Sequence, residues 1–115
     1  MENAYAPYSG FKVGAGALAA SGKMYIGCNI ENASYGLTVC AERVAIFDAV
    51  SNGEREIKAV AISNSHGTPA FPCGACLQVM AEFAPRGEDM RIVLLSDQGT
   101  QEYKLSDLLP HAFRL

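Results

Sequence analysis

Two helical patterns, each opening on a cysteine, lie between short apolar segments typical of β-strands, and this order restricts the possible folds more than any other feature. The first pattern begins at Cys40 and the second at Cys73, and Asn52-Gly53 supplies a stop signal for the first. A strand–helix–strand unit places its two strands parallel in one sheet. The sequence therefore predicts an α/β fold in which helices cover a mixed sheet.

The expected elements follow the order strand, strand, helix, strand, helix, strand, strand, helix. Gly14 and Gly16 weaken the first strand, and Ser106 is expected to cap the last helix. The expected strands span residues 11–20, 24–28, 57–63, 91–95 and 101–104, the helices begin at 40, 73 and 106, and turn-forming residues indicate loops over 29–38 and 65–72.

The charge balance narrows the possible partners. Nine Lys and Arg stand against twelve Asp and Glu, which gives a net charge of −3. A domain that follows a phosphate backbone usually carries a basic patch, so a nucleic-acid polymer is not expected as a ligand.

No apolar run approaches the roughly 20 residues that span a bilayer, and no charged-then-apolar leader opens the chain. We expect a soluble, cytoplasmic protein without a membrane partner, in which residues 1–115 form one domain because neither repeat nor linker interrupts the pattern.

Four cysteines are too few for a small secreted disulfide scaffold, and their spacing indicates metal binding or redox chemistry instead. Cys40 and Cys73 open predicted helices, and Cys76 completes a C-x-x-C pair. Free N–H groups and the helix dipole stabilise thiolates at helix starts. Three converging thiolates could bind Zn²⁺ and leave one tetrahedral position open for water. Glu42, two residues after Cys40, is placed to accept and return protons beside that water.

The combination C-A-E at 40–42, followed about thirty residues later by P-C-G-A-C at 72–76, is the signature of zinc deaminases. Further segments resemble the small, three-cysteine, homotetrameric cytidine deaminases of pyrimidine salvage, and the likeness covers nearly the whole chain. These segments are A-Y-A-P-Y-S (4–9), F-K-V-G-A (11–15), G-C-N-I-E-N-A (27–33), C-A-E-R (40–43) and L-L-P-H-A-F (108–113).

The resemblance implies a three-layer α/β/α fold with a mixed five-stranded sheet and one Zn²⁺ per subunit. The implied reaction is the hydrolytic deamination of cytidine and deoxycytidine to uridine and deoxyuridine, with release of ammonia. Glu42 would carry the protons, and the cysteines at 40, 73 and 76 would hold the metal. Arg43 is a candidate to donate hydrogen bonds to a thiolate and so offset the negative charge of the three ligands.

The resemblance also implies a substrate site. Asn29 and Glu31 would bind the ribose hydroxyls. Phe11 would pack beside the nucleoside, and the backbone of Ala41 would fix the amide edge of the base. Phe113 would reach the site of a neighbouring subunit. The other positions that match contacts across a subunit boundary are Ala33 and Tyr35.

Two features depart from the family pattern. Many members have arginine after the last zinc cysteine, where this chain has Leu77, and members usually carry a helix before A-Y-A-P-Y-S, where only Met1-Glu2-Asn3 precede it. Half of the residues are hydrophobic, and the remaining helices cannot easily cover so much apolar surface in a chain of this size. We therefore expect a homo-oligomer, in agreement with the implied tetramer.

Three alternatives remain. Cys73 and Cys76 could form a thioredoxin-like redox pair, although this leaves Cys40 and Glu42 without a role. A purely structural zinc site would need Cys28 or a histidine as fourth ligand, but neither histidine has ligand-like spacing. Within the same fold, a deaminase of nucleoside antibiotics of the blasticidin S type shares the cysteine motifs, whereas the N-I-E-N run at 29–32 favours a ribose-bearing substrate.

Overall fold

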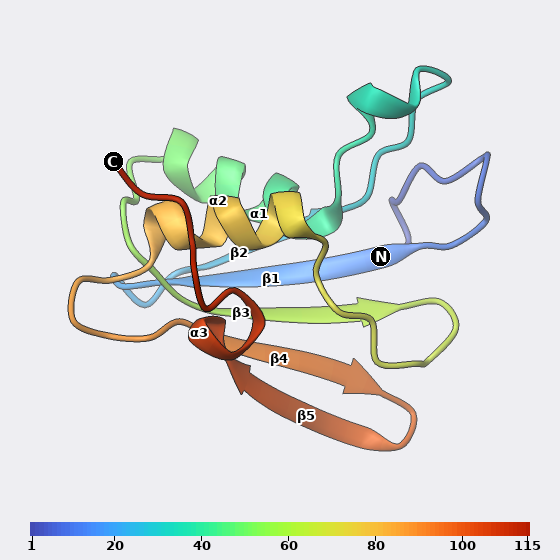
Figure 1. Ribbon diagram of the computed structural model, residues 1–115. Coiled ribbons are helices and arrows are strands. Elements are labelled where there is room, and N and C mark those ends of the chain that lie inside the picture. Colours follow the sequence, from blue (N-terminus) through green and yellow to red (C-terminus); the bar gives the residue numbers. More distant parts are fainter.

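A mixed five-stranded sheet forms the centre of the computed structural model, which describes residues 1–115 (Figure 1). The strands lie in the order β2-β1-β3-β4-β5, and only β3 and β4 pair in parallel. Their bounds are Val13–Ala19 for β1, Met24–Cys28 for β2, Ile57–Asn64 for β3, Arg91–Ser96 for β4 and Gly99–Lys104 for β5. The α/β class and the mixed five-stranded sheet expected from the sequence are thus confirmed.

Two helices lie side by side on one face of this sheet (Figure 1). Helix α1 (Ala41–Ser51) follows β2, and helix α2 (Gly74–Phe83) connects the parallel strands β3 and β4. Both begin directly after the cysteine that the helical pattern predicted. Gly53 adopts a φ of +97° just after α1, a left-handed conformation that ends the helix. The short helix α3 (Leu105–Leu108) contacts α2 and β5.

Helix α1 approaches the sheet closely because the strands beneath it present small residues. Ala15, Ala17 and Ala19 of β1 are buried in the core. On β2, a Cβ built on Gly27 would lie 2.5 Å from the backbone nitrogen of Ala45, well inside van der Waals contact. Only glycine therefore fits at position 27, and the position of α1 depends on it.

The opposite face of the sheet carries apolar side chains that α1 and α2 do not cover. Met24 and Ile26 of β2 alternate with Gly27, so they point away from α1. Ile26 is 73% exposed. This surface is consistent with the expectation that the chain hides apolar area against other subunits.

The element order agrees with the sequence-based prediction, apart from details at the ends. The first strand begins at Val13 rather than at residue 11, and a 3-10 turn, η1 (Tyr35–Leu37), interrupts the expected loop. The predicted cap of the last helix is wrong: α3 starts after Lys104, whose N–H donates to Asp107 Oδ2 at 3.0 Å. Ser106 donates its hydroxyl to Asp89 instead. None of the helices combines the length and the apolar character that spanning a bilayer requires.

Candidate active site

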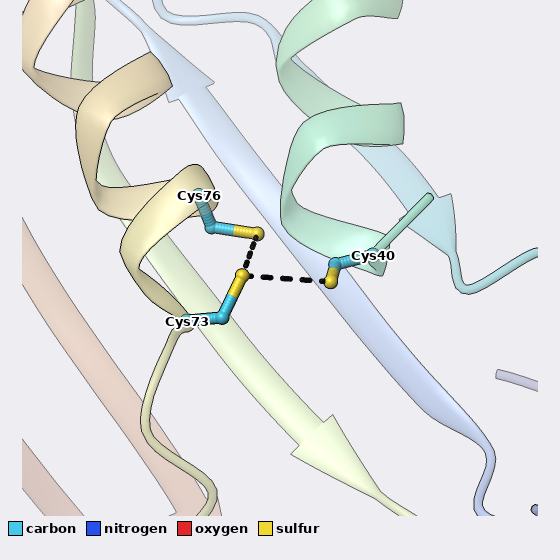
Figure 2. Close-up of side chains that lie close together, drawn as sticks. All are labelled: Cys40, Cys73 and Cys76. Atoms are coloured by element: carbon cyan, nitrogen blue, oxygen red, sulfur yellow. Dashed lines mark hydrogen bonds between the residues drawn. The ribbon is translucent and has the colours of Figure 1, made fainter. Parts of the chain in front are cut away.

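The starts of α1 and α2 bring three cysteines together. Cys40 precedes the first residue of α1 and Cys73 the first residue of α2, both with extended backbone, and Cys76 lies in the first turn of α2. Figure 2 shows the three sulfurs turned toward one another between the two helices. The fold therefore forms the predicted cluster by bringing Cys40 to Cys73, which is 33 positions away in sequence.

The sulfur positions fit one tetrahedral metal ion. Cys40 Sγ lies 3.8 Å from Cys73 Sγ, Cys73 Sγ lies 3.5 Å from Cys76 Sγ, and all three sulfurs are within 4.8 Å of one another. A zinc–sulfur bond of about 2.3 Å and tetrahedral angles place thiolate sulfurs roughly 3.8 Å apart. Cys28 does not belong to the group. The three cysteines thus fit one Zn²⁺ and leave a fourth position for another ligand.

The surroundings of the cluster favour a thiolate at Cys40. The neighbouring Cys76 thiol, and then the Arg43 guanidinium, lower the pKa of Cys40 to about 5 against the opposing effect of burial. Arg43 Nη2 donates to Cys40 Sγ at 3.5 Å. The hydrogen bond between Cys76 and Cys40, together with burial, raises the pKa of the Cys76 thiol. Arg43 thus lies where the expected hydrogen bond to a thiolate is possible. Leu77 is buried in the hydrophobic core.

Glu42 lies beside the cysteines in the first turn of α1, with only 4% of its surface exposed. Burial raises the pKa of its carboxyl, and the charge of Cys40 adds to this effect. A raised pKa makes the protonated carboxyl easier to reach, so that the group can accept a proton in one step and return it in another. Its environment therefore suits the proton-carrying role that the sequence suggested.

A cavity of about 260 Å³ opens in front of Glu42 and two of the cysteines. It is slightly smaller than the roughly 300–1,000 Å³ of typical small-molecule sites. Six other residues singled out in the sequence share its lining with Glu42: Phe11, Asn29, Glu31, Cys40, Ala41 and Cys73. Apolar side chains make up most of the remaining wall, so the cavity suits a ligand that has apolar as well as polar surface.

Asn29 braces one wall of this cavity. Its side-chain Oδ1 accepts a hydrogen bond from Val13 N at 2.9 Å, and its Nδ2 donates to Phe11 O at 2.9 Å. These bonds hold the segment before β1 against the end of β2. Because an amide nitrogen has two N–H groups, Asn29 keeps one donor for a ligand.

Glu31 organises the loop at the mouth of the cavity. Its carboxylate accepts hydrogen bonds from Tyr8 N at 3.0 Å, from Ser9 N at 3.1 Å and from the Ser9 hydroxyl. The Ser9 hydroxyl is the main reason that the pKa of Glu31 is lowered. Glu31 therefore stays ionised and presents its remaining lone pairs to hydroxyl groups.

Three expected contact residues lie outside the lining of this cavity. Tyr35 lies on η1, which projects from the body of the protein, and it is 79% exposed (Figure 1). Its ring centroid is 6.4 Å from that of Tyr8. Ala33 is exposed on the same loop, and Phe113, on the C-terminal segment, is 70% exposed. One chain alone does not bring these residues to the cavity.

The sequence analysis missed two aromatic neighbours of the site. Phe71 lines the cavity and packs on Tyr103 with ring centroids 5.2 Å apart. His66 meets Phe11 edge-on at 4.8 Å. The position of Phe71 directly before Pro72-Cys73 was the only signal that could have revealed it, whereas the contact of His66 depends on the tertiary fold.

A larger cavity, of about 760 Å³, lies elsewhere, between the end of α2 and α3. Its polar lining includes Arg86, Asp89 and His111, but no cysteine. The chemistry therefore points to the smaller cavity.

Comparisons with known proteins agree with this geometry. A family model described as the cytidine and deoxycytidylate deaminase zinc-binding region matches residues 1–91. A cytidine deaminase of Halalkalibacterium halodurans is 52% identical over 113 residues, covering 97% of this chain and 84% of that protein. One of Mycobacterium tuberculosis is 45% identical over 112 residues, covering 97% and 80%. The crystal structure of cytidine deaminase from Burkholderia pseudomallei has a TM-score of 0.88 at 47% identity, covering 97% of this chain and 89% of that one.

Proposed function

The chain belongs to the cytidine and deoxycytidylate deaminase family, and we propose that it catalyses the hydrolytic deamination of cytidine and deoxycytidine to uridine and deoxyuridine. The observation that carries this proposal is the meeting of three cysteine sulfurs and the buried Glu42 carboxyl beside one cavity. Such a set can activate water and move its protons in one place, as hydrolysis of an amino group requires.

Cys40, Cys73 and Cys76 would hold Zn²⁺, which supplies a Lewis acid that activates water for attack on the C4 carbon. Glu42 accepts the proton that this water loses. It passes that proton to N3 of the ring as the C4–oxygen bond forms. It then takes the remaining proton from the new hydroxyl on C4 and delivers it to the amino group as the C4–nitrogen bond breaks and ammonia leaves. The raised pKa of Glu42 supports both directions of transfer.

The other side chains of the cavity would position the nucleoside. Glu31 accepts hydrogen bonds from ribose hydroxyls, and Asn29 donates its free N–H to one of them. Phe11 packs against the nucleoside, and the backbone of Ala41 pairs with the amide edge of the base. The presence of Asn29 and Glu31 in the same cavity lining as Cys73 and Glu42 supports this assignment.

We further infer that the working unit is a homotetramer in which subunits complete one another's sites. The cavity formed by one chain is small and open, and three expected contact residues lie outside it. Phe113 would enter the site of a neighbouring subunit, and Ala33 and Tyr35 would contact nucleoside across a boundary. The uncovered sheet face around Ile26 supplies apolar area for association.

The cellular setting follows from the same chemistry. Four free cysteines, three of which are needed as thiolates, suit a reducing compartment. We infer that residues 1–115 act as one catalytic domain in the cytoplasm, where the reaction serves the salvage of pyrimidine nucleosides.

The redox alternative has one observation in its favour. Cys73 Sγ and Cys76 Sγ are only 3.5 Å apart at a helix start. However, Cys40 Sγ lies only 3.8 Å from Cys73 Sγ and Arg43 contacts it, and a two-cysteine mechanism uses neither contact. The relatives reported above are cytidine deaminases, which favours the hydrolytic reaction over both this alternative and a blasticidin S deaminase.

The decisive experiment follows the ultraviolet absorbance of cytidine with purified protein of measured zinc content. Glu42→Gln should keep the zinc and lose nearly all of kcat, because the amide cannot carry protons. Glu82→Gln, on the exposed side of α2, makes the same chemical change away from the site and should match the wild type. Activity that survives Glu42→Gln contradicts the mechanism, and turnover of blasticidin S in preference to cytidine contradicts the substrate.

A further inference from the structure

One side chain of α2 holds the C-terminal segment through two hydrogen bonds. Gln78 Nε2 donates a hydrogen bond to Phe113 O at 2.8 Å, and Phe113 N donates to Gln78 Oε1 at 3.3 Å. The amide of Gln78 thus pairs with both backbone polar groups of Phe113, as a neighbouring strand would. No other side chain in this protein pairs with both the N–H and the C=O of one distant residue.

This clamp leaves the ring of Phe113 free. The residue is 70% exposed although both of its backbone groups are paired. A second anchor follows immediately, because Arg114 Nη1 donates to Ala81 O, also on α2, at 3.0 Å. An exposed aromatic ring on a fastened backbone gains nothing for the isolated chain. It is preorganised to enter a pocket outside this chain, since less conformational entropy is then lost on contact.

We propose that Gln78 is a positioning residue that holds Phe113 in the direction from which it enters the site of a neighbouring copy of the chain. The inference rests on the proposed function, in which that ring completes the neighbour's nucleoside site. It goes further in assigning a role to Gln78, which lies outside the cavity and touches no reacting group.

The chemistry of the side chain supports this assignment. Pairing with both an N–H and a C=O needs a donor and an acceptor, and the side-chain amide of Gln provides both on one planar group. Gln78 lies on α2, which begins at the metal-binding cysteines. The Phe113 ring, which enters the site of a neighbouring copy, is therefore held in a fixed position relative to the metal cluster of its own subunit. Each active site then depends on the fold of two chains.

Mixed assemblies of two tagged, co-expressed variants test the proposal. One subunit carries Glu42→Gln and keeps Phe113, and the other carries Phe113→Ala and keeps Glu42. If the ring crosses the boundary, the second subunit receives it from the first, and the isolated mixture recovers deaminase activity that neither variant shows alone. Zinc content, sedimentation and the thermal midpoint are measured on each mixture.

Gln78→Ala is then placed in one subunit type at a time. In the subunit that donates the ring, it should lower the recovered kcat/KM by about three- to tenfold, mainly through KM, as expected for lost neutral hydrogen bonds. In the Phe113→Ala subunit, which has no ring to hold, it should not lower the recovered activity further. Gln78→Glu keeps the acceptor but faces Phe113 O with a carboxylate, so it should give the same one-sided loss.

Gln98→Ala, in the exposed turn between β4 and β5, is the matched control and should have no effect in either subunit. Equal losses from Gln78→Ala in both subunits would indicate a general structural role and overturn the proposal. Recovery that is insensitive to Gln78 overturns it as well. A mixture that shows no recovery, beside an active wild type, shows that the ring does not cross and overturns it while deamination stands. A wild type that does not deaminate cytidine refutes the proposed function itself.

Discussion

Replacing Gly27 with alanine tests whether the active site depends on the close approach of α1 to β2. The new Cβ would lie 2.5 Å from Ala45 N and 2.6 Å from Ala41 O, whereas ordinary contact begins at 3.4 Å. The difference requires α1 to withdraw by about 0.9 Å, because both obstacles are backbone atoms that cannot rotate away. The N-terminal turn of α1 carries Glu42 and follows Cys40, so the site must move with it.

Two free-energy effects oppose each other in this variant. Alanine restricts the unfolded chain and suits a strand better than glycine, which stabilises the fold by roughly 0.5–1 kcal/mol. Overpacking against fixed backbone costs about 1–3 kcal/mol. The second effect is larger, so the free energy of unfolding should fall by about 1–2 kcal/mol. A displacement near 1 Å at the catalytic groups should lower kcat by about 10²-fold.

Urea unfolding followed by circular dichroism measures the first quantity, and steady-state kinetics with cytidine at fixed zinc loading measures the second. Gly36→Ala is the stability control, because nothing lies within 4 Å of the added Cβ and the backbone there is not left-handed. Gly27→Ala with wild-type unfolding and wild-type kcat would refute the reasoning.

Three further predictions concern single groups. The pKa of the Glu31 carboxyl, measured by NMR, should lie below its ordinary value of 4.5, and Ser9→Ala should raise it. The stabilising contribution of the ionised carboxylate is present at neutral pH and is lost as pH falls through the lowered pKa. The destabilisation caused by Ser9→Ala should therefore fade in acid. Zinc analysis should find Cys28→Ser fully loaded and Cys76→Ser empty, with a lower thermal midpoint in the empty protein; loss of metal from Cys28→Ser argues against an open fourth position. Arg91→Ala removes an exposed ion pair with Glu102 and should change the unfolding free energy by less than about 1 kcal/mol, and a larger change in urea unfolding contradicts this.

The parts of the site that depend on local sequence were predictable. Cys40 and Cys73 open helices because stop and start signals surround them, and the chemistry of a cysteine at a helix start is the same in any fold. The order of strands and helices was also predictable, because apolar periodicity is a property of the local sequence. The capping of α3 was missed because Asp89, 17 residues away, takes the hydroxyl of Ser106.

Features that depend on distant contacts were not predictable from the residues. Asn29 was expected to serve a ligand, yet its side-chain oxygen and one of its N–H groups hold Val13 and Phe11 in place. The requirement for glycine at position 27 arises only when α1 docks, and the exposure of Phe113 only when Gln78 fastens its backbone. Each of these depends on two segments that meet only in the folded chain.

The row of small residues on β1 has a consequence for mutational scanning. Ala15, Ala17 and Ala19 are closely packed beneath the helix that positions Glu42, so larger side chains there should push the helix away as alanine does at position 27. In a screen scored only by deaminase activity, these positions would tolerate as few amino acids as the proton carrier itself. Tolerance maps of this enzyme would therefore mark a stripe of alanines as if they touched substrate, and only a parallel measurement of folded protein would separate the two groups.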